Sequence, residues 1–355
     1  MNNRQQPEIL FIVDIPCWAH DYKTIQLQSM LEANYRIIKL RESEVTEVDL
    51  DRADLIVVYY WSQFRRMKDL TLSFMRNRYK ILIGICSHAE FEGRRREPGL
   101  AMLRRFAHGV FCVNKLLYNE FRSLVETPIF YTPNGVDTDF YRPSAGATTA
   151  VRPRTARTEH PRHDRLPAKL RARLHFGNCL RLLRQGIARQ RPHHAHSLRV
   201  GWAGSLSNHG SKQRGFYNLI VPAVYSVRGA QLVTAIREEQ WRGPDEMLEF
   251  YRSLDVYVCA SRNEGTPNPC LEAAACGVPL VTTRVGNMID LIESKVNGLF
   301  VEPTISDIAS QITLLRDEPQ LRTILRRNIL RSIQAWTWKR QAENYRQMFD
   351  AMLDN

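Results

Sequence analysis

Two glutamates eight residues apart, Glu264 and Glu272, are the side chains of this chain whose type and spacing most clearly suggest chemistry. They flank a turn that leads from an apolar strand into a helix of small residues. Asn268 is the expected N-cap of that helix, and Pro269 is tolerated at the first helical position. The helix start should then offer unpaired N–H groups and a positive dipole end to an anion such as a diphosphate.

The two carboxylates suit the ends of the same ligand. Glu272 should lie in the first helical turn, where it could accept hydrogen bonds from two ribose hydroxyls, as acidic residues do in dinucleotide sites. Glu264 should lie on the other side of the anion position. A ligand with hydroxyls at both ends and negative charge in the middle is a sugar nucleotide, although acidic residues near a helix start also occur without any ligand.

Further matches extend this motif over most of the chain. Residues 198–301 resemble the donor domain of the GT-B retaining glycosyltransferases of family 4 (glycosyl transferases group 1). The family signature of two glutamates, an alanine, a glycine and a proline corresponds to Glu264, Glu272, Ala273, Gly277 and Pro279. The stretch Thr132–Asp137, followed by Phe140 and Pro143, resembles the segment that closes the N-terminal domain in that family.

The resemblance implies roles on the donor side. Glu264 would hold the sugar, and Lys212 or Arg214 would neutralise the diphosphate, because the family has a cation before a glycine at this point. The donor-binding residues implied are Gly204, Ser205, Gly265, Thr266, Pro267, Asn268 and Glu272. Neither a cofactor nor a metal is expected, since the nucleotide sugar is the co-substrate.

The N-terminal half offers fewer matches. His88 follows an apolar strand, and the carboxyl edge of a strand in a doubly wound sheet faces the ligand crevice. Related enzymes often carry a histidine there, so His88 is expected beside the reacting sugar. Where the family often has a Gly-Gly loop, this chain has residues 14–20, and Trp18 and His20 become acceptor-side candidates.

Apolar runs that alternate with amphipathic stretches predict an α/β fold with two doubly wound, Rossmann-like domains facing across a cleft. The expected division is an acceptor-side domain at 1–143, an insertion at 144–197, a donor domain at 198–335 and a C-terminal helix at 336–355 that crosses back to the first domain. Strands are expected at 9–13, 35–40, 55–60, 81–86, 109–113, 129–131, 199–203, 230–234, 256–260, 279–283 and 298–301. The expected helices include 22–33, 65–78, 98–107, 114–125, 244–252, 269–276, 305–316, 318–332 and 339–353.

The segment 144–197 fits neither domain. It contains eleven Arg and one Lys against Glu159 and Asp164, and so carries most of the net charge of +13. Three interpretations remain open: a poorly ordered insertion, a basic patch for anionic lipid or nucleic acid, or a segment foreign to the fold. The pair Asp49 and Asp51 superficially resembles metal-binding carboxylates but is interpreted as a solvated, charged loop.

Composition limits the class of protein. The 355 residues suffice for two domains, no run of about 18 apolar residues predicts a membrane span, and the N-terminus lacks a signal-peptide pattern. The seven cysteines form neither a zinc spacing nor a disulfide framework. We therefore expect a cytoplasmic protein. Arg94–Arg96 with Arg104 and Arg105 leave open a peripheral contact with an anionic inner membrane surface, and nucleic acid is not an expected partner.

The function expected from this resemblance is transfer of a sugar from a nucleotide-sugar donor to a glycan or lipid-linked acceptor, with retention and without a metal. Two alternatives remain open. A GT-B sugar-nucleotide epimerase would convert the donor with no acceptor present, and a non-catalytic protein would bind the nucleotide sugar or an anionic surface without turnover.

Overall fold

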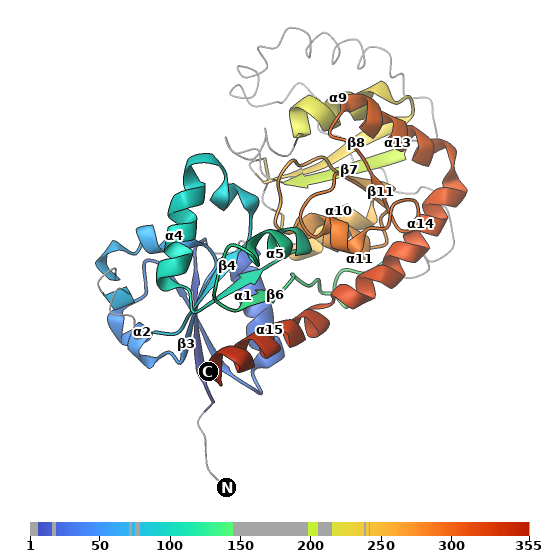
Figure 1. Ribbon diagram of the computed structural model, residues 1–355. Coiled ribbons are helices and arrows are strands. Elements are labelled where there is room, and N and C mark those ends of the chain that lie inside the picture. The colour runs from blue at the N-terminus through green and yellow to red at the C-terminus, as the bar shows by residue number, and fades with distance from the viewer. Residues whose placement is uncertain are drawn as a thin grey trace.

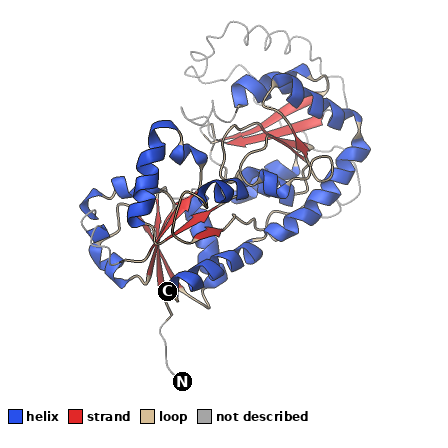
Figure 2. Ribbon diagram, in the orientation of Figure 1, coloured by secondary structure: helices blue, strands red, loops and turns tan. Residues whose placement is uncertain are grey.

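The computed structural model describes residues 6–15, 19–70, 73–74, 79–144, 198–204, 215–237, 239–240 and 242–354. Within these residues the chain forms two parallel sheets with helices packed around each, as Figures 1 and 2 show. The expected α/β class with two Rossmann-like domains is confirmed. The basic segment, apart from Ser144 and Leu198 at its edges, lies outside the described residues.

The N-terminal sheet has the described strand order β2-β1-β3-β4-β5-β6. Its strands are β1 (Glu8–Val13), β2 (Arg36–Arg41), β3 (Leu55–Val58), β4 (Ile81–Ile85), β5 (Gly109–Cys112) and β6 (Ile129–Tyr131). The helices around it are α1 (Ala19–Leu31), α2 (Glu47–Arg52), α4 (Arg96–Phe106) and α5 (Lys115–Phe121). Every residue of β3, β4 and β5 is buried. A parallel sheet covered on both faces accounts for the continuous apolar runs in these strands.

The C-terminal sheet has the described order β11-β10-β9-β7-β8. Its strands are β7 (Leu198–Gly204), β8 (Ala230–Ile236), β9 (Val256–Cys259), β10 (Leu280–Thr282) and β11 (Leu299–Phe300). The helices are α9 (Val221–Ser226), α10 (Pro244–Arg252), α11 (Asn268–Ala275), α12 (Met288–Leu291), α13 (Ile305–Asp317) and α14 (Pro319–Ser332), with a π-helical turn at Phe216–Ile220. The order changes direction beside β7 and β9, and ligands bind at such a switch point in open α/β sheets.

The last helix, α15 (Trp338–Leu353), lies against the N-terminal domain (Figure 1). It contacts α1 and β3, and its Tyr345 hydroxyl donates to the Thr132 carbonyl at 2.8 Å. Where the chain crosses between domains, Val136 and Thr337 form a parallel bridge. A Cβ on Gly135 would lie 2.6 Å from the Trp338 backbone. The two segments that cross between the domains, at residues 135–136 and 337–338, are therefore packed tightly against each other.

Two expectations about local structure differ from the described residues, the first entirely and the second over residues 65–70. Asp49 and Asp51 lie in helix α2, because Thr46 accepts from the Asp49 N–H while the Asp49 carboxylate accepts from the Thr46 N–H. This capping box starts a helix where a loop was expected. The helix expected at 65–78 begins as 3₁₀ turns at Trp61–Arg65 and Lys68–Leu70. The buried Gln63 amide accepts from two backbone N–H groups and donates to the Ile12 carbonyl, which replaces helical hydrogen bonding there.

The docking of α15 predicts a large effect of one substitution. Phe349 is fully buried, and its ring lies 6.0 Å from that of Phe11 and 5.4 Å from that of Tyr35. Phe349→Ala should lower the free energy of unfolding by about 3–5 kcal/mol, since it leaves a cavity under the helix. Urea unfolding followed by circular dichroism measures this. Gln347→Ala, on the exposed face of the same helix, is the control and should change little. Equal midpoints for the two variants would contradict the packing described.

Candidate active site between the domains

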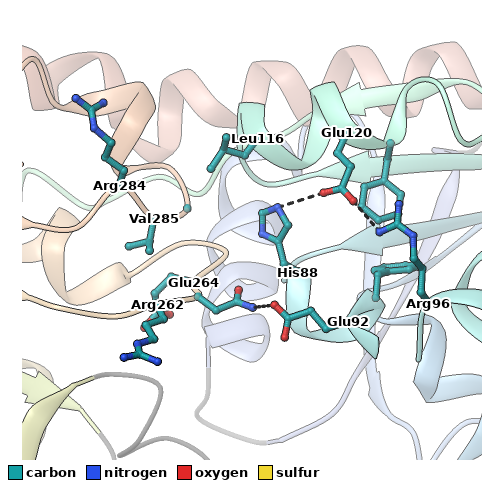
Figure 3. Close-up of a pocket in the computed structure, with 13 residues that line it drawn as sticks. His88, Glu92, Arg96, Leu116, Glu120, Arg262, Glu264, Arg284 and Val285 are labelled. Carbon is teal, nitrogen blue, oxygen red and sulfur yellow. Dashed lines mark hydrogen bonds and ion pairs between the residues drawn. The ribbon is translucent and has the colours of Figure 1, made fainter. Parts of the chain in front are cut away.

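A cavity of about 270 Å³ lies between the two domains (Figure 3). The N-terminal domain contributes His88, Phe91, Glu92, Arg96, Leu116, Glu120 and Phe121 to its lining. The C-terminal domain contributes Arg262, Asn263, Glu264, Arg284, Val285 and Gly286. The lining is rich in charged groups of both signs, so the cavity suits a polar ligand with hydroxyls better than an apolar one.

Glu264 and His88 come from different domains and line this same cavity. Glu264 follows β9, and its carboxylate accepts a hydrogen bond of 2.8 Å from the Ser261 hydroxyl. His88 begins a 3₁₀ turn after β4, where the Ser87 hydroxyl caps the turn by accepting from the Ala89 N–H. Both side chains thus stand at carboxyl ends of parallel strands, which is where the crevice rule places ligand-contacting groups.

Gly265 lies in close contact with the N-terminal domain. A Cβ at this position would lie 1.7 Å from the Cys86 carbonyl oxygen at the end of β4. The Asn114 side chain donates to the Gly265 carbonyl at 2.9 Å. Gly286 has a φ of +51°, and its own Cβ would lie 2.4 Å from that carbonyl. Only glycine allows this close approach, which brings Glu264 to the cavity wall opposite His88.

The start of α11 differs from the expectation. Pro267 is the N-cap and Asn268 is the first helical residue, so the prediction of Asn268 as N-cap is wrong. The Asn268 amide oxygen instead accepts from Asn134 of the other domain at 3.1 Å. The N–H groups of Asn268 and Cys270 donate to the carbonyls of Thr266 and Pro267, and Pro269 has none. The positive helix end remains, but it has fewer unpaired donors than the sequence suggested.

Glu272 is the fifth residue of α11, outside the first turn where it was expected. The Tyr251 hydroxyl donates to its carboxylate at 2.6 Å. Burial raises the pKa of Glu272 to about 7, and the Tyr251 hydrogen bond opposes that rise. Burial, then Asp137 and Glu272, raise the pKa of Tyr22 in α1 to about 12. Glu272 therefore lies within electrostatic range of the N-terminal domain but is not among the residues that line the cavity.

The structure describes some of the other residues that were expected to bind the donor and does not describe the rest. Gly204 ends β7, and its carbonyl accepts from the Arg237 N–H. The Thr266 hydroxyl is buried without a hydrogen-bond partner, and Pro267 is buried. Ser205, Lys212 and Arg214 lie outside the described residues. Gly215, which follows Arg214, has a φ of +67°, and its Cβ would lie 2.8 Å from the Ala260 carbonyl after β9.

Of the two acceptor-side candidates only His20 is described, and it does not line the cavity. His20 is buried in the N-terminal domain, where it stacks on the Tyr59 ring at 4.2 Å and lies 3.4 Å from Asp14. Burial lowers the pKa of His20. It does not line the cavity, because α1 begins before it and directs it into the core. Trp18 lies outside the described residues.

Three residues that the sequence did not single out shape the site. The Glu120 carboxylate contacts both His88 and Arg96. Asp290 accepts from the Lys115 N–H and the Tyr131 hydroxyl, each at 3.0 Å, and so ties α12 to the other domain. Asn114 follows β5 at the carboxyl edge of the sheet. The edge rule that identified His88 could also have found Asn114. No sequence signal indicates that Glu120 meets His88 and Arg96 within its own domain, or that Asp290 bonds Lys115 and Tyr131 across the boundary.

No set of three or more His, Cys, Asp or Glu side chains in the described residues is placed to hold a metal ion. None of the described helices combines the length and apolar character needed to cross a bilayer.

Comparison with known sequences relates the donor side to one family. Residues 239–331 match the family described as Glycosyl transferases group 1. A D-inositol 3-phosphate glycosyltransferase of Saccharomonospora viridis is 33% identical over 115 residues, which are 32% of this chain and 25% of that protein. The N,N'-diacetylbacillosaminyl-diphospho-undecaprenol alpha-1,3-N-acetylgalactosaminyltransferase of Campylobacter jejuni is 26% identical over 111 residues, which are 31% of this chain and 30% of that protein. The matched segment thus spans about a quarter to a third of these relatives.

Comparison with solved structures covers nearly the whole chain. Anabaena Alr3699/HepE in complex with UDP and glucose matches 98% of this chain and 100% of its own, with a TM-score of 0.67 and 14% identity. Sucrose-phosphate synthase of Thermosynechococcus elongatus matches 98% and 100%, with a TM-score of 0.62 and 18% identity. These likenesses show the same two-domain fold.

The close approach of Gly265 can be tested directly. Gly265→Ala should force apart the Cys86 carbonyl and the loop between β9 and α11, at a cost of about 1–3 kcal/mol to the closed arrangement. Small-angle X-ray scattering should then show a larger radius of gyration. Gly243→Ala is the control, because its Cβ would meet nothing within 4 Å. A scattering curve for Gly265→Ala that matches the wild type would show that this contact does not set the spacing of the domains.

Proposed function

We propose that this chain, which has the GT-B fold and whose residues 239–331 belong to the glycosyl transferases group 1, transfers a sugar from a nucleotide donor to a glycan or lipid-linked acceptor. The observation that carries the proposal is the meeting of Glu264 and His88, from opposite domains, at one charged cavity. The family match supports sugar transfer, and a two-domain fold of this kind can exclude water from the crevice when the domains approach each other.

In the proposed reaction, the bond between the anomeric carbon and the diphosphate oxygen breaks while the acceptor hydroxyl oxygen bonds to the same face of that carbon. The departing phosphate takes the proton of the acceptor hydroxyl, and the anomeric configuration is retained. No protein base of high strength and no metal is needed. The protein contributes orientation and a water-poor site, in which Glu264 and His88 hold sugar or acceptor hydroxyls.

The donor would lie across the boundary between the domains. Glu272 would accept the two ribose hydroxyls, and Lys212 or Arg214 would neutralise the diphosphate as charge develops on it. The partner of Glu272, Tyr251, supports this role, because its hydroxyl fixes one carboxylate oxygen and leaves the other to accept from a ligand. UDP-glucose is the first donor to test, since a structure of the same fold holds UDP and glucose.

An acceptor held at a membrane surface would fit the charge of α4. Arg94, Arg104 and Arg105 are exposed on or beside this helix, whereas Arg96 pairs with Glu120 at the cavity. Each exposed basic residue near an anionic surface contributes about 1 kcal/mol. We include peripheral contact of this face with anionic lipid in the proposal.

Glu272 gives the sharpest test of the donor site. A nucleotide at 100 times its Kd stabilises the folded chain by about 2.7 kcal/mol, which a thermal-shift panel of nucleoside diphosphates and nucleotide sugars detects. Glu272→Gln should weaken binding of the recognised nucleotide by roughly 10- to 100-fold, since it removes hydrogen bonds to a charged acceptor. In the wild type, the ligand-induced shift should grow between pH 6 and pH 8, because the pKa of Glu272 is about 7 and the carboxylate is the better acceptor.

The stability of the ligand-free chain should follow the opposite trend with pH, and subtracting its melting temperature from that of the nucleotide-bound sample removes this contribution. The folded pKa of Glu272 is raised above its ordinary 4.5, so its contribution to stability is greatest below pH 4.5 and falls as the pH approaches 7. Glu264→Gln is the matched comparison and should keep nucleotide binding while losing turnover. The same nucleotide affinity at both pH values in the wild type, or unchanged affinity in Glu272→Gln, would contradict the ribose role. Sugar conversion without any acceptor would indicate an epimerase.

A further inference from the structure

The cavity contains a chain of three charged or titratable side chains whose central member is Glu120 in α5. One carboxylate oxygen, Oε1, accepts from Arg96 Nη1 at 3.0 Å. The other, Oε2, lies 3.5 Å from His88 Nε2 (Figure 3). All three side chains line the cavity, and each is partly buried. Glu120 therefore joins a structural cation on one side to the histidine nearest the proposed reaction on the other.

We propose that Glu120 is a positioning residue that fixes the ring orientation and the tautomer of His88. A carboxylate can only accept, so its contact with Nε2 favours the tautomer that carries the proton there. The lone pair then resides on Nδ1. In Figure 3 the other ring nitrogen of His88 faces the side of the cavity formed by Glu264 and Val285. His88 is thus prepared to accept a hydrogen bond from a hydroxyl of the sugar or the acceptor.

Arg96 makes the carboxylate a fixed rather than a mobile partner. Arg96 is at the start of α4 and Glu120 is in α5, so the pair holds two helices of the N-terminal domain together beside the cavity. Because Oε1 is bound to the guanidinium, only Oε2 is directed to the imidazole. A long-chain carboxylate without such an anchor would sample several rotamers and would orient the ring poorly.

The position of α5 depends in turn on the donor domain. Asp290 accepts from the Lys115 N–H at the first residue of this helix, and Asn114 donates to the Gly265 carbonyl. Asn114 also caps the helix by accepting from the Leu117 N–H at 2.9 Å. The helix has seven residues, so its N-terminus and Glu120 move as one short unit. Contact between the domains therefore also sets where Glu120 meets His88.

The consequence of the inference, a hydrogen bond from a substrate hydroxyl to Nδ1 of His88, rests on the proposed function. The tautomer of His88 itself can be observed without substrate. The variant to use is Glu120→Gln. Arg96 should retain the amide oxygen, so the amide NH₂ faces His88 Nε2 and donates to it. This puts a donor in place of an acceptor beside Nε2 and favours the proton on Nδ1, while the volume of the side chain stays nearly the same.

The first measurement is nitrogen-15 NMR of the imidazoles in the unligated, full-length protein. The His88 resonances are those that disappear in His88→Asn. In the wild type, the proton should be on Nε2, and in Glu120→Gln it should move to Nδ1. Glu126→Gln makes the same change of charge at an exposed position after α5 and should leave the pattern unchanged. The same tautomer in wild type and Glu120→Gln would overturn the proposal, whether or not sugar transfer is ever detected.

The second measurement is transfer with the donor identified by thermal shift. Glu120→Gln should lower kcat by roughly 100-fold with little change in the KM for the donor, because the wrong tautomer cannot accept the substrate hydroxyl. In the background of His88→Asn, the same substitution should cause no further loss. Additive losses in the double variant would show that Glu120 acts independently of His88 and would overturn the positioning role. Glu120→Asp, which keeps the charge but shortens the reach, should fall between Glu120→Gln and the wild type.

Discussion

The loop between β9 and α11 lies in close contact with the end of β4 in the N-terminal sheet, and the site depends on this contact. Gly265 lies against the Cys86 carbonyl and receives a hydrogen bond from Asn114, and no side chain larger than hydrogen fits between them. This contact brings together the carboxyl ends of strands from two separate sheets. Glu264 on one side and His88 on the other then face a common cavity that neither domain could form alone.

The rest of the molecule supports this contact from a distance. The bridge between Val136 and Thr337 and the docking of α15 on the N-terminal domain also join the domains. Asp290 adds a polar connection between α12 and the first domain. Burial raises the pKa of that carboxyl, so it is partly desolvated in the seam.

Much of this could be read from the sequence. Strands such as β1 and β3 are recognisable in the sequence as continuous apolar runs. Helices α10 and α15 follow the amphipathic pattern, and their first residues match known helix-start signals. The spacing of Glu264 and Glu272 predicted a resemblance to the glycosyl transferases group 1, and residues 239–331, which include both glutamates, match that family. The segments whose structure was predicted wrongly are short. Helix α2 depends on the single side chain of Thr46, and the turns after β3 depend on that of Gln63.

The parts of the site that could not be predicted are the ones that link distant segments. Asn268 looked like a helix cap by every local rule, yet its side chain bonds Asn134 across the domain boundary. Glu120 has an unremarkable helical context, and its meaning appears only when α4, α5 and the turn after β4 converge. Tertiary contacts of this kind leave no periodicity in one sequence, so a local signal can be overridden without warning.

The most direct test of the account is a crystal structure of the chain with an intact nucleotide sugar, beginning with UDP-glucose. The account predicts the sugar in the cavity between Glu264 and His88, the ribose hydroxyls on the Glu272 carboxylate, and the proton-free nitrogen of His88 within hydrogen-bond distance of a hydroxyl. A nucleotide bound away from the domain boundary, or one whose ribose does not approach Glu272, would contradict it.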